Sequence, residues 1–488
     1  MSDAPKQIPV CSDVREADDE EEHGAFIDLS DAENVIVDES KLGPVDEEDG
    51  DDHGNYDHSN SSIAEGACLV RGCANTHGNE NEECDTEDDC AEDLNEVPDR
   101  EPERDDALSV FTARDAAPVH AIVAHPSDAS IFAAGGQSDE VYILQLSADC
   151  RAVKTAAVLQ EVHTDTVSVL AFSPDGSRLA SGGLDGVVAI WSTATWQLQH
   201  GLHDLSGELL SLLWHPSGLV LVAGADDGQA AMWNVLKGSL AMYFAGHSGA
   251  VNCTAWSPCR KRLVTGGGDG SVIIFAPRTG QQEAHIAKGL SPDRAAVTAL
   301  CCLGDCDPGE TSSSKLNALD DYDDRCIVGC DDGTLHVVSL RTGRAVCSLQ
   351  EVHNQAVESL QVNSGTLSGG SSYGGRSPDR SDLARLFLSA SCDCKVAVWS
   401  VTDLSLRAVF HVGESVIPAV WAHGHLIVAG CSDGEVKVWD GRSQQQMPLA
   451  RFMGHRRMVL HLAVVEHHGI IASASDDGTV RFFKPEPT

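Results

Sequence analysis

Short stretches in which apolar and polar residues alternate recur along the chain. In CSDGEVKVWD, residues 431–440, a Ser-Asp-Gly turn is followed by Glu, Val, Lys, Val and Trp, which alternate strictly. An alternation of period two is typical of a β-strand, whose side chains point to opposite faces in turn. The stretch therefore predicts a tight turn followed by a strand, and it raises the question whether Asp433 holds that turn or does chemistry.

The same pattern of turn and strand occurs in seven copies, and a weaker eighth, GGQSDEVYIL, ends at Leu144. The turn Asp residues of the seven copies stand at positions 185, 227, 269, 332, 393, 433 and 477. Four of the six steps between them measure 40 to 44 residues, which fits the length of one propeller blade. An acidic residue that recurs at this period is expected to be structural.

Three further strand patterns accompany each copy. Around the copy that ends at Trp191, an apolar stretch at 167–172 and RLASGG precede it, and a short strand near Leu198 follows it. Four short strands of this kind predict one antiparallel blade of a β-propeller. The two long steps of 63 and 61 residues contain Gly-, Ser- and Asp-rich insertions at about 305–324 and 363–382. We predict that both are loops between the first and second strands of their blades.

The last blade is one strand short. After Phe483 only KPEPT follows, which is too short for a fourth strand, and a missing strand would leave an unpaired sheet edge. The apolar stretch ALSVFTAR, residues 107–114, precedes the first blade, and we predict that it pairs with residues 479–483. The predicted fold is therefore an all-β, eight-bladed propeller over residues 107–488, closed by an N-terminal strand.

The acidic residues are concentrated before the propeller. The chain of 488 residues has a net charge of -42, and residues 1–106 hold about 36 Asp and Glu against about 6 Lys and Arg. Only two aromatic residues, Phe26 and Tyr56, lie in this stretch. It has too little apolar surface to offset its chain entropy, so we predict an acidic, disordered tail over 1–106. The overall charge disfavours direct nucleic-acid binding and favours a basic protein partner.

Seventeen Cys are scattered along the chain, many of them inside apolar strands. Such Cys pack as small hydrophobes, and no signal peptide or membrane-spanning apolar run is visible, so we expect an intracellular protein without disulfides or membrane insertion. A zinc site is conceivable in the tail from Cys68, Cys73, Cys84, Cys90 and His77. Their spacing is loose for a structural site, and we expect no bound metal.

These repeats resemble the WD40 family. In that family, a His before the first strand, a Ser or Thr in the second, the turn Asp and the Trp of the third strand form a structural hydrogen-bond network. The resemblance assigns this network to three blades, and it assigns structural positions to Asp433 and Trp439. The residues are His163, Ser181, Asp185 and Trp191, then His247, Thr265 and Asp269, then His455, Ser473 and Asp477. Ala223 and Ala429 replace the Ser or Thr in two other blades.

A set of His, Ser and Asp also invites a hydrolase interpretation. A nucleophile needs one activated site, whereas this set recurs from blade to blade. Gly-rich runs such as GGGDG, residues 266–270, lie between strands and lack the Lys and Ser or Thr of a phosphate-binding loop. We therefore predict a protein that is not an enzyme and has no cofactor.

Further acidic residues fall in turns and loops that the repeat predicts to lie on one face of the propeller. Together they predict a negative rim that attracts a Lys- and Arg-rich segment and releases it in salt. The residues of this predicted rim are Glu161, Asp165, Asp204, Glu208, Asp226, Asp331, Glu351, Glu414 and Asp476.

A narrower resemblance concerns the third blade and the tail. Trp214-His215-Pro216 in the third blade, and the apolar islands at 25–29 and 35–49 among the carboxylates, are similar to the family of angio-associated migratory cell protein. That family includes a yeast ribosome-assembly chaperone that escorts a basic large-subunit ribosomal protein by its N-terminal segment. The resemblance implies a monomeric, cytoplasmic chaperone of such a protein, with nuclear shuttling and other protein partners left open.

One motif supports an alternative. Trp439, Asp440 and Arg442 form a Trp-Asp-x-Arg sequence, which resembles the box by which some WD40 proteins dock onto cullin-type ubiquitin ligases. The alternative function is a substrate receptor of such a ligase, or a scaffold in signalling or cell migration.

Overall fold

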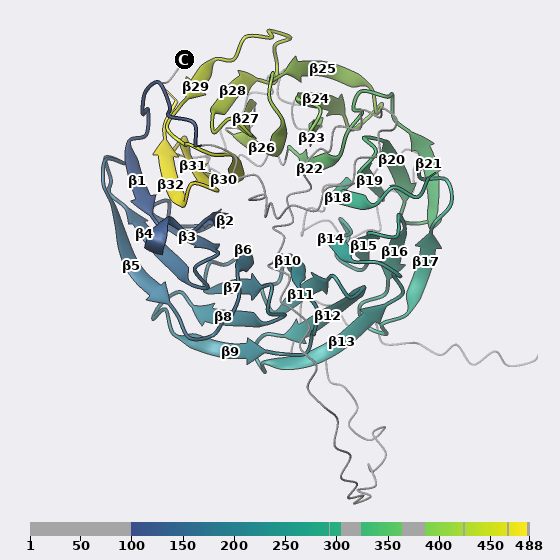
Figure 1. Ribbon diagram of the computed structural model, residues 1–488. Coiled ribbons are helices and arrows are strands. Elements are labelled where there is room, and N and C mark those ends of the chain that lie inside the picture. The colour runs from purple at the N-terminus through teal and green to yellow at the C-terminus, as the bar shows by residue number, and fades with distance from the viewer. Residues whose placement is uncertain are drawn as a thin grey trace, which may run out of the picture. The chain divides into compact units, whose positions relative to one another are not determined.

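The computed structural model describes residues 99–291, 293–303, 324–363, 386–422, 425–465 and 468–485. Within these residues, thirty-two strands form eight four-stranded antiparallel sheets (Figure 1). The first strand of each sheet contacts the first strand of the next, and β30 contacts β2, so that the sheets form a closed ring of blades. The predicted all-β, eight-bladed propeller is confirmed.

Blades 1 to 7 each consist of four strands in sequence order, numbered from the inner to the outer strand. Blade 1 is β2 (Val119–Ala124), β3 (Ile131–Gly136), β4 (Val141–Leu146) and β5 (Val153–Leu159); blade 2 is β6 (Val167–Phe172), β7 (Arg178–Gly183), β8 (Val188–Ser192) and β9 (Leu198–Leu202). Blade 3 is β10 (Leu209–Trp214), β11 (Val220–Ala225), β12 (Gln229–Asn234) and β13 (Ser239–Ala245); blade 4 is β14 (Val251–Trp256), β15 (Leu263–Gly267), β16 (Val272–Phe275) and β17 (Gln282–Ile286). Blade 5 is β18 (Val297–Leu303), β19 (Arg325–Cys330), β20 (Leu335–Ser339) and β21 (Arg344–Ser348); blade 6 is β22 (Val357–Val362), β23 (Leu386–Ser391), β24 (Lys395–Ser400) and β25 (Leu406–His411). Blade 7 is β26 (Val416–Ala422), β27 (Leu426–Cys431), β28 (Val436–Asp440) and β29 (Ala450–Phe452).

Blade 8 joins the two ends of the described chain. Its strands are β30 (Val459–Val465), β31 (Ile470–Ser475), β32 (Thr479–Phe483) and, on the outside, β1 (Ser109–Thr112). β1 runs antiparallel to β32, with Ser109 opposite Phe482 and Thr112 opposite Thr479. The predicted closing strand is therefore confirmed. A 3-10 turn, η3 (Arg114–Ala116), then leads from β1 toward β2.

The core is divided into eight apolar clusters, each of which lies between two neighbouring blades. The cluster between blades 8 and 1 contains Phe482 of β32 and Phe132 of β3, whose ring centroids lie 5.0 Å apart. A blade in such a ring buries both faces of its middle strands, which explains the continuous apolar runs of the second and third strands. Closing the ring with β1 therefore protects a core as well as an edge.

Both predicted insertions fall on residues that the structure leaves undescribed, apart from their ends. β18 ends at Leu303 and β19 begins at Arg325, while β22 ends at Val362 and β23 begins at Leu386. Each insertion thus connects the first and second strands of one blade. The predicted tail is likewise outside the described residues up to residue 98. The prediction of disorder is wrong for its last part, 99–106, because Arg100 and Asp106 donate backbone hydrogen bonds to Arg456 and Met453. Among the described residues, no helix is long and apolar enough to cross a bilayer.

Candidate functional site

The turn aspartates stabilise the turns between second and third strands. The Oδ1 atom of Asp433 accepts a hydrogen bond of 3.0 Å from the backbone N–H of Glu435, and Gly434 between them has a φ of 83°. This left-handed conformation suits glycine, and an Asp before it stabilises the turn through the backbone. The other six turn aspartates accept the same bond, from Val187, Gln229, Ser271, Thr334, Lys395 and Thr479.

In blade 2 the predicted network is complete. The indole N–H of Trp191 donates to the Ser181 hydroxyl at 2.9 Å, that hydroxyl lies 2.8 Å from Nε2 of His163, and Nδ1 of His163 lies 3.4 Å from Asp185. An indole N–H can only donate a hydrogen bond, so the Ser hydroxyl accepts from Trp and donates to His, and His donates to Asp. Ser181 is fully buried, so its hydroxyl is closed to a substrate and serves the packing between blades.

Blades 4 and 8 contain the same network without the indole. His455 lies between Ser473, at 2.7 Å from Nε2, and Asp477, at 3.1 Å from Nδ1. His247 is held in the same way between Thr265 and Asp269. Phe275 and Phe483 occupy the Trp position and pack without donating a hydrogen bond.

Blade 6 contains a fourth network that the sequence analysis missed. Nε2 of His353 lies 2.8 Å from the Ser389 hydroxyl, which accepts a bond of 2.9 Å from Trp399, and Nδ1 lies 3.1 Å from Asp393. His and Ser are 18 residues apart in the other blades but 36 apart here, because an insertion separates them. The spacing of Ser and Trp is the signal that identifies the set. Trp399 follows Ser389 by ten residues, and Trp191 follows Ser181 by the same number.

Burial and hydrogen bonding fix the protonation of these networks. Burial of Asp477 disfavours its charge, but hydrogen bonds from His455, Thr479 and the backbone of Arg456 outweigh that effect and hold the pKa below its usual range. The balance is the same for Asp393, whose pKa is lowered to about 2. Burial lowers the pKa of His455. In the blade 8 network, burial thus favours a neutral imidazole of His455 beside the carboxylate of Asp477.

In the two blades that lack the Ser or Thr, the indole N–H of the Trp donates its hydrogen bond to a different acceptor. In blade 3 the indole N–H of Trp233 donates to the carboxylate of Asp204 at 2.6 Å. In blade 7 the indole of Trp439 donates to the backbone carbonyl of Gln446 at 3.0 Å. Asp204, which the sequence analysis assigned only to the rim, is thus also a structural residue.

All nine residues of the predicted rim lie on one face of the propeller, which we call the top face. It carries the turns between second and third strands and the connections from one blade to the next, which antiparallel topology places at the same end. In every blade a backbone N–H of the turn donates to a carbonyl of the connection, as Asp226 does to Glu208 at 3.0 Å. Six of the nine are in connections, and Asp226, Asp331 and Asp476 are in turns.

The exposure of these carboxylates differs. Glu161, Asp165, Asp204, Asp226 and Glu351 are exposed, and the remaining four are partly buried. Asp476 pairs with Arg457 at 3.5 Å, and Asp226 accepts the backbone N–H of Glu208 at 2.9 Å. The structure places the nine on one face but spread around it.

The opposite, bottom face carries more basic than acidic side chains among the described residues. The basic residues in its turns, which join first to second and third to fourth strands, are Arg151, Lys237, Arg260, Lys261, Arg262, Arg278, Arg341 and Arg442, and the acidic residues are Asp128, Asp149, Asp175, Asp324 and Asp403. The residues of the Trp-Asp-x-Arg motif are placed here. Trp439 is buried, while Arg442 is exposed and pairs in a bidentate manner with Asp440, at 2.7 and 2.9 Å.

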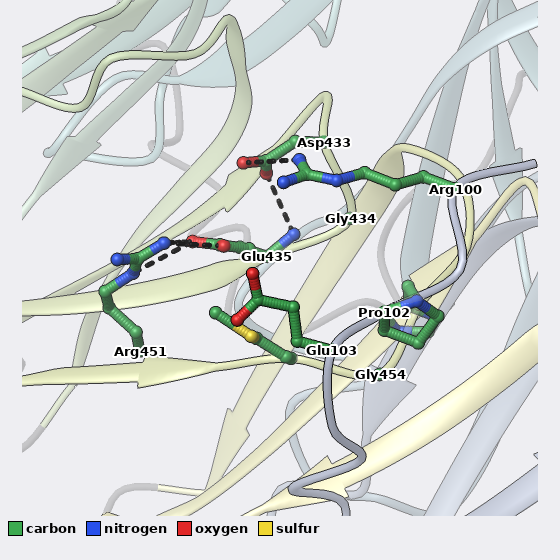
Figure 2. Close-up of a pocket in the computed structure, with 10 residues that line it drawn as sticks. Arg100, Pro102, Glu103, Asp433, Gly434, Glu435, Arg451 and Gly454 are labelled. Atoms are coloured by element: carbon green, nitrogen blue, oxygen red, sulfur yellow. Dashed lines mark hydrogen bonds and ion pairs between the residues drawn. The ribbon is translucent and has the colours of Figure 1, made fainter.

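A small pocket opens on the top face where blades 7 and 8 meet (Figure 2). Its volume is about 140 Å³, which is below the size of a typical small-molecule site. Asp433 and Glu435 line it from the turn of blade 7, and Arg100 and Glu103 line it from the segment before β1. Among the described residues, no group of His, Cys, Asp and Glu is arranged to hold a metal ion. The Cys and His weighed for zinc lie outside them.

The family model of the WD domain, G-beta repeat, matches residues 155–192, 197–234, 238–275, 414–440 and 446–484. The chain contains WD40 repeats at these five positions. The matched segments cover the first three strands of blades 2, 3, 4, 7 and 8, and the segment 155–192 also includes most of β5, the outer strand of blade 1. The unmatched blades include the two that hold the insertions.

Local similarity connects the chain to several proteins of other lengths. It is 35% identical over 89 residues to p21-activated protein kinase-interacting protein 1-like of Danio rerio, covering 18% of this chain and 23% of that protein. It is 33% identical over 86 residues to U3 small nucleolar RNA-associated protein 15 of Schizosaccharomyces pombe, covering 18% and 16%. The chain thus spans less than a quarter of the length of these relatives.

Solved structures match over the whole propeller. Saccharomyces cerevisiae Sqt1 has a TM-score of 0.64 at 18% identity and covers 79% of this chain and 100% of its own. Chaetomium thermophilum Sqt1, in a structure bound to the N-terminus of ribosomal protein L10, has a TM-score of 0.64 at 19% identity, with coverages of 78% and 100%. The computationally designed Ika8 protein has a TM-score of 0.59 at 21% identity, with coverages of 78% of this chain and 99% of its own. At these identities the likeness shows the fold alone.

Proposed function

We propose that this protein binds a Lys- and Arg-rich protein segment on its top face and acts as a chaperone for a newly made basic ribosomal protein of the large subunit. The observation that carries the proposal is that the nine predicted rim carboxylates all lie on the top face and that five of them are exposed. A face on which one charge predominates attracts a partner of the other charge and aligns it before contact.

The comparisons support the choice of partner. Sqt1 is similar in fold to this chain over its whole length, and one of its structures holds the N-terminus of ribosomal protein L10. A segment rich in Lys and Arg complements carboxylates that are exposed, such as Glu161 and Glu351. Ribosomal-protein capture of this kind begins in the cytoplasm, where we place the protein.

The positions of the reactive side chains support a binding role without catalysis. The His, Ser and Asp sets are buried between blades and engaged in structural bonds. The top-face pocket is small and lined by charged side chains that pair with one another. We therefore assign the protein no reaction and no cofactor.

The exposed side chain of Arg442 on the bottom face favours the ligase-receptor alternative. That alternative requires the guanidinium to leave Asp440, its present partner. It predicts that Arg442→Ala abolishes association with cullin-ligase components and leaves binding of a basic segment unchanged.

The proposal is tested by charge reversal on each face. Glu161→Lys and Glu351→Lys are expected to weaken binding of the N-terminal segment of ribosomal protein L10, each by at least about threefold at low salt. Asp149→Lys makes the same charge change on the bottom face and is expected to leave the affinity almost unchanged. Equal effects from both faces would show that net charge alone governs binding.

A further inference from the structure

The segment just before β1 crosses blades 7 and 8. We call residues 99–106 the strap. Its backbone is fixed at both ends, since the N–H of Arg100 donates to the carbonyl of Arg456 at 3.0 Å and the N–H of Asp106 donates to that of Met453 at 2.9 Å. The Asp106 carboxylate also accepts the N–H of Met453 at 3.0 Å.

Acidic side chains of the strap pair with arginines of blade 8. Asp99 lies 2.6 Å from Arg457, and Glu101 lies 3.4 Å from Arg456, both on the top face. Asp105 pairs with Arg481 in β32. The pairs of Asp99 and Glu101 are exposed, and such pairs are individually weak and are screened by salt, whereas Arg481 is buried. The strap is thus held by several contacts that can be released one by one.

Arg100 is directed toward the ring instead. Figure 2 shows its guanidinium beside the Asp433 carboxylate, at 3.5 Å. The side chain of Asp433 is 9% exposed, whereas that of Arg100 is 60% exposed. Lys437 is 3.9 Å from the same carboxylate, and Arg451 is paired with Glu435 instead. Arg100 is therefore the cation that approaches Asp433 from the solvent side.

We propose that Asp433 is a guanidinium-binding subsite of the top face, which Arg100 occupies in cis and an arginine of a basic partner segment occupies when the strap moves aside. The inference rests on the proposed function and adds its regulation. The turn that carries Asp433 lies on the same face as the rim, and the pocket beside it has room for the end of one side chain. The strap therefore competes with the partner segment for Asp433, and the Arg100–Asp433 ion pair lowers the affinity for that segment.

The test uses the full chain and the N-terminal segment of ribosomal protein L10 as a peptide, titrated by calorimetry at low salt. Arg100→Ala is expected to tighten binding roughly two- to fivefold, the range of one exposed ion pair. Arg151→Ala removes the same charge from the bottom face and is the matched control, with no change expected. In an Asp433→Asn background, which keeps the oxygen that holds the turn, Arg100→Ala is expected to have no effect.

Hydrogen exchange gives a second measurement. The backbone amides of Arg100 and Asp106 are expected to exchange faster when the peptide is bound. Wild-type affinity in Arg100→Ala, or tightening that persists in the Asp433→Asn background, overturns the subsite and leaves the proposed function standing. A wild-type chain that does not bind the peptide contradicts the proposed function itself, and the subsite with it.

Discussion

The indole nitrogen of Trp233 lies 2.6 Å from a carboxylate oxygen of Asp204. Trp233 is fully buried, whereas Asp204 is exposed on the top face in the connection that leads into blade 3. This bond replaces the one that a Ser would accept in the second strand, where Ala223 stands. A residue of the acidic rim thus stabilises the interior of a blade.

Asp204→Ala is therefore expected to lower the free energy of unfolding by about 1–2 kcal/mol, because it leaves a buried indole N–H without an acceptor. Asp165→Ala removes an exposed rim carboxylate and is expected to change stability by less than about 0.5 kcal/mol. Urea unfolding followed by Trp fluorescence measures both. Equal stabilities of the two variants would contradict a structural role for Asp204.

Ser389→Ala removes the central hydroxyl of the blade 6 network. It leaves both Nε2 of His353 and the indole N–H of Trp399 unpaired in the core, so we expect a loss of about 2–4 kcal/mol. Ser127→Ala, at an exposed turn on the bottom face, is the control and is expected to be nearly neutral. A neutral Ser389→Ala in the same denaturation assay would show that the network contributes nothing to stability.

Acid is expected to destabilise the propeller in two stages. The pKa of His455 and that of His247 are lowered in the fold by burial, so the native state favours their neutral form. Their contribution is complete above the unfolded pKa of about 6.5 and is lost as pH falls below it. The lowered pKa of Asp393, about 2, adds a contribution that is complete above about pH 4 and is lost below it.

The melting temperature should accordingly be level between about pH 7 and pH 8, fall from there toward pH 5, and fall again below pH 4. Calorimetry across this range measures the profile. In His455→Gln the first decline should be shallower, because one of the groups that take up a proton on unfolding is gone. A first stage of unchanged size would show that His455 does not contribute to it.

A series of N-terminal deletions separates the tail, the strap and the closing strand. Removing residues 1–98 should leave the melting temperature unchanged, since none of the described contacts is lost. Removing 1–107 takes away the strap and should lower it by a few degrees. Removing 1–112 also takes away β1 and exposes the edge of β32, and we expect a fall of at least about 10 °C. Equal melting temperatures for the last two chains would contradict closure by β1.

Much of the fold could be predicted because the same pattern of turn and strand recurs in every blade. The turn Asp and Gly residues, with an alternating strand after them, mark each blade by local chemistry that needs no distant partner. Even β1, far from β32 in sequence, was predictable from an unsatisfied edge.

The site was less predictable because its contacts are not periodic. The Trp233–Asp204 bond depends on a substitution in a neighbouring strand, and the His353–Ser389 pair was hidden by an insertion. The pairing of Arg100 with Asp433 joins residues more than 300 positions apart. No pattern along the chain links them, and only the closed ring brings them together.

The central claim is that the top face holds a basic protein segment by charge. The most direct test is calorimetric titration of the full chain with the N-terminal segment of ribosomal protein L10, at low and at high salt. We predict one-to-one binding with micromolar or tighter affinity at low salt, weakened at least tenfold at high salt and by Glu161→Lys. Absence of binding at low salt, or binding that neither salt nor the rim substitution changes, would contradict the claim.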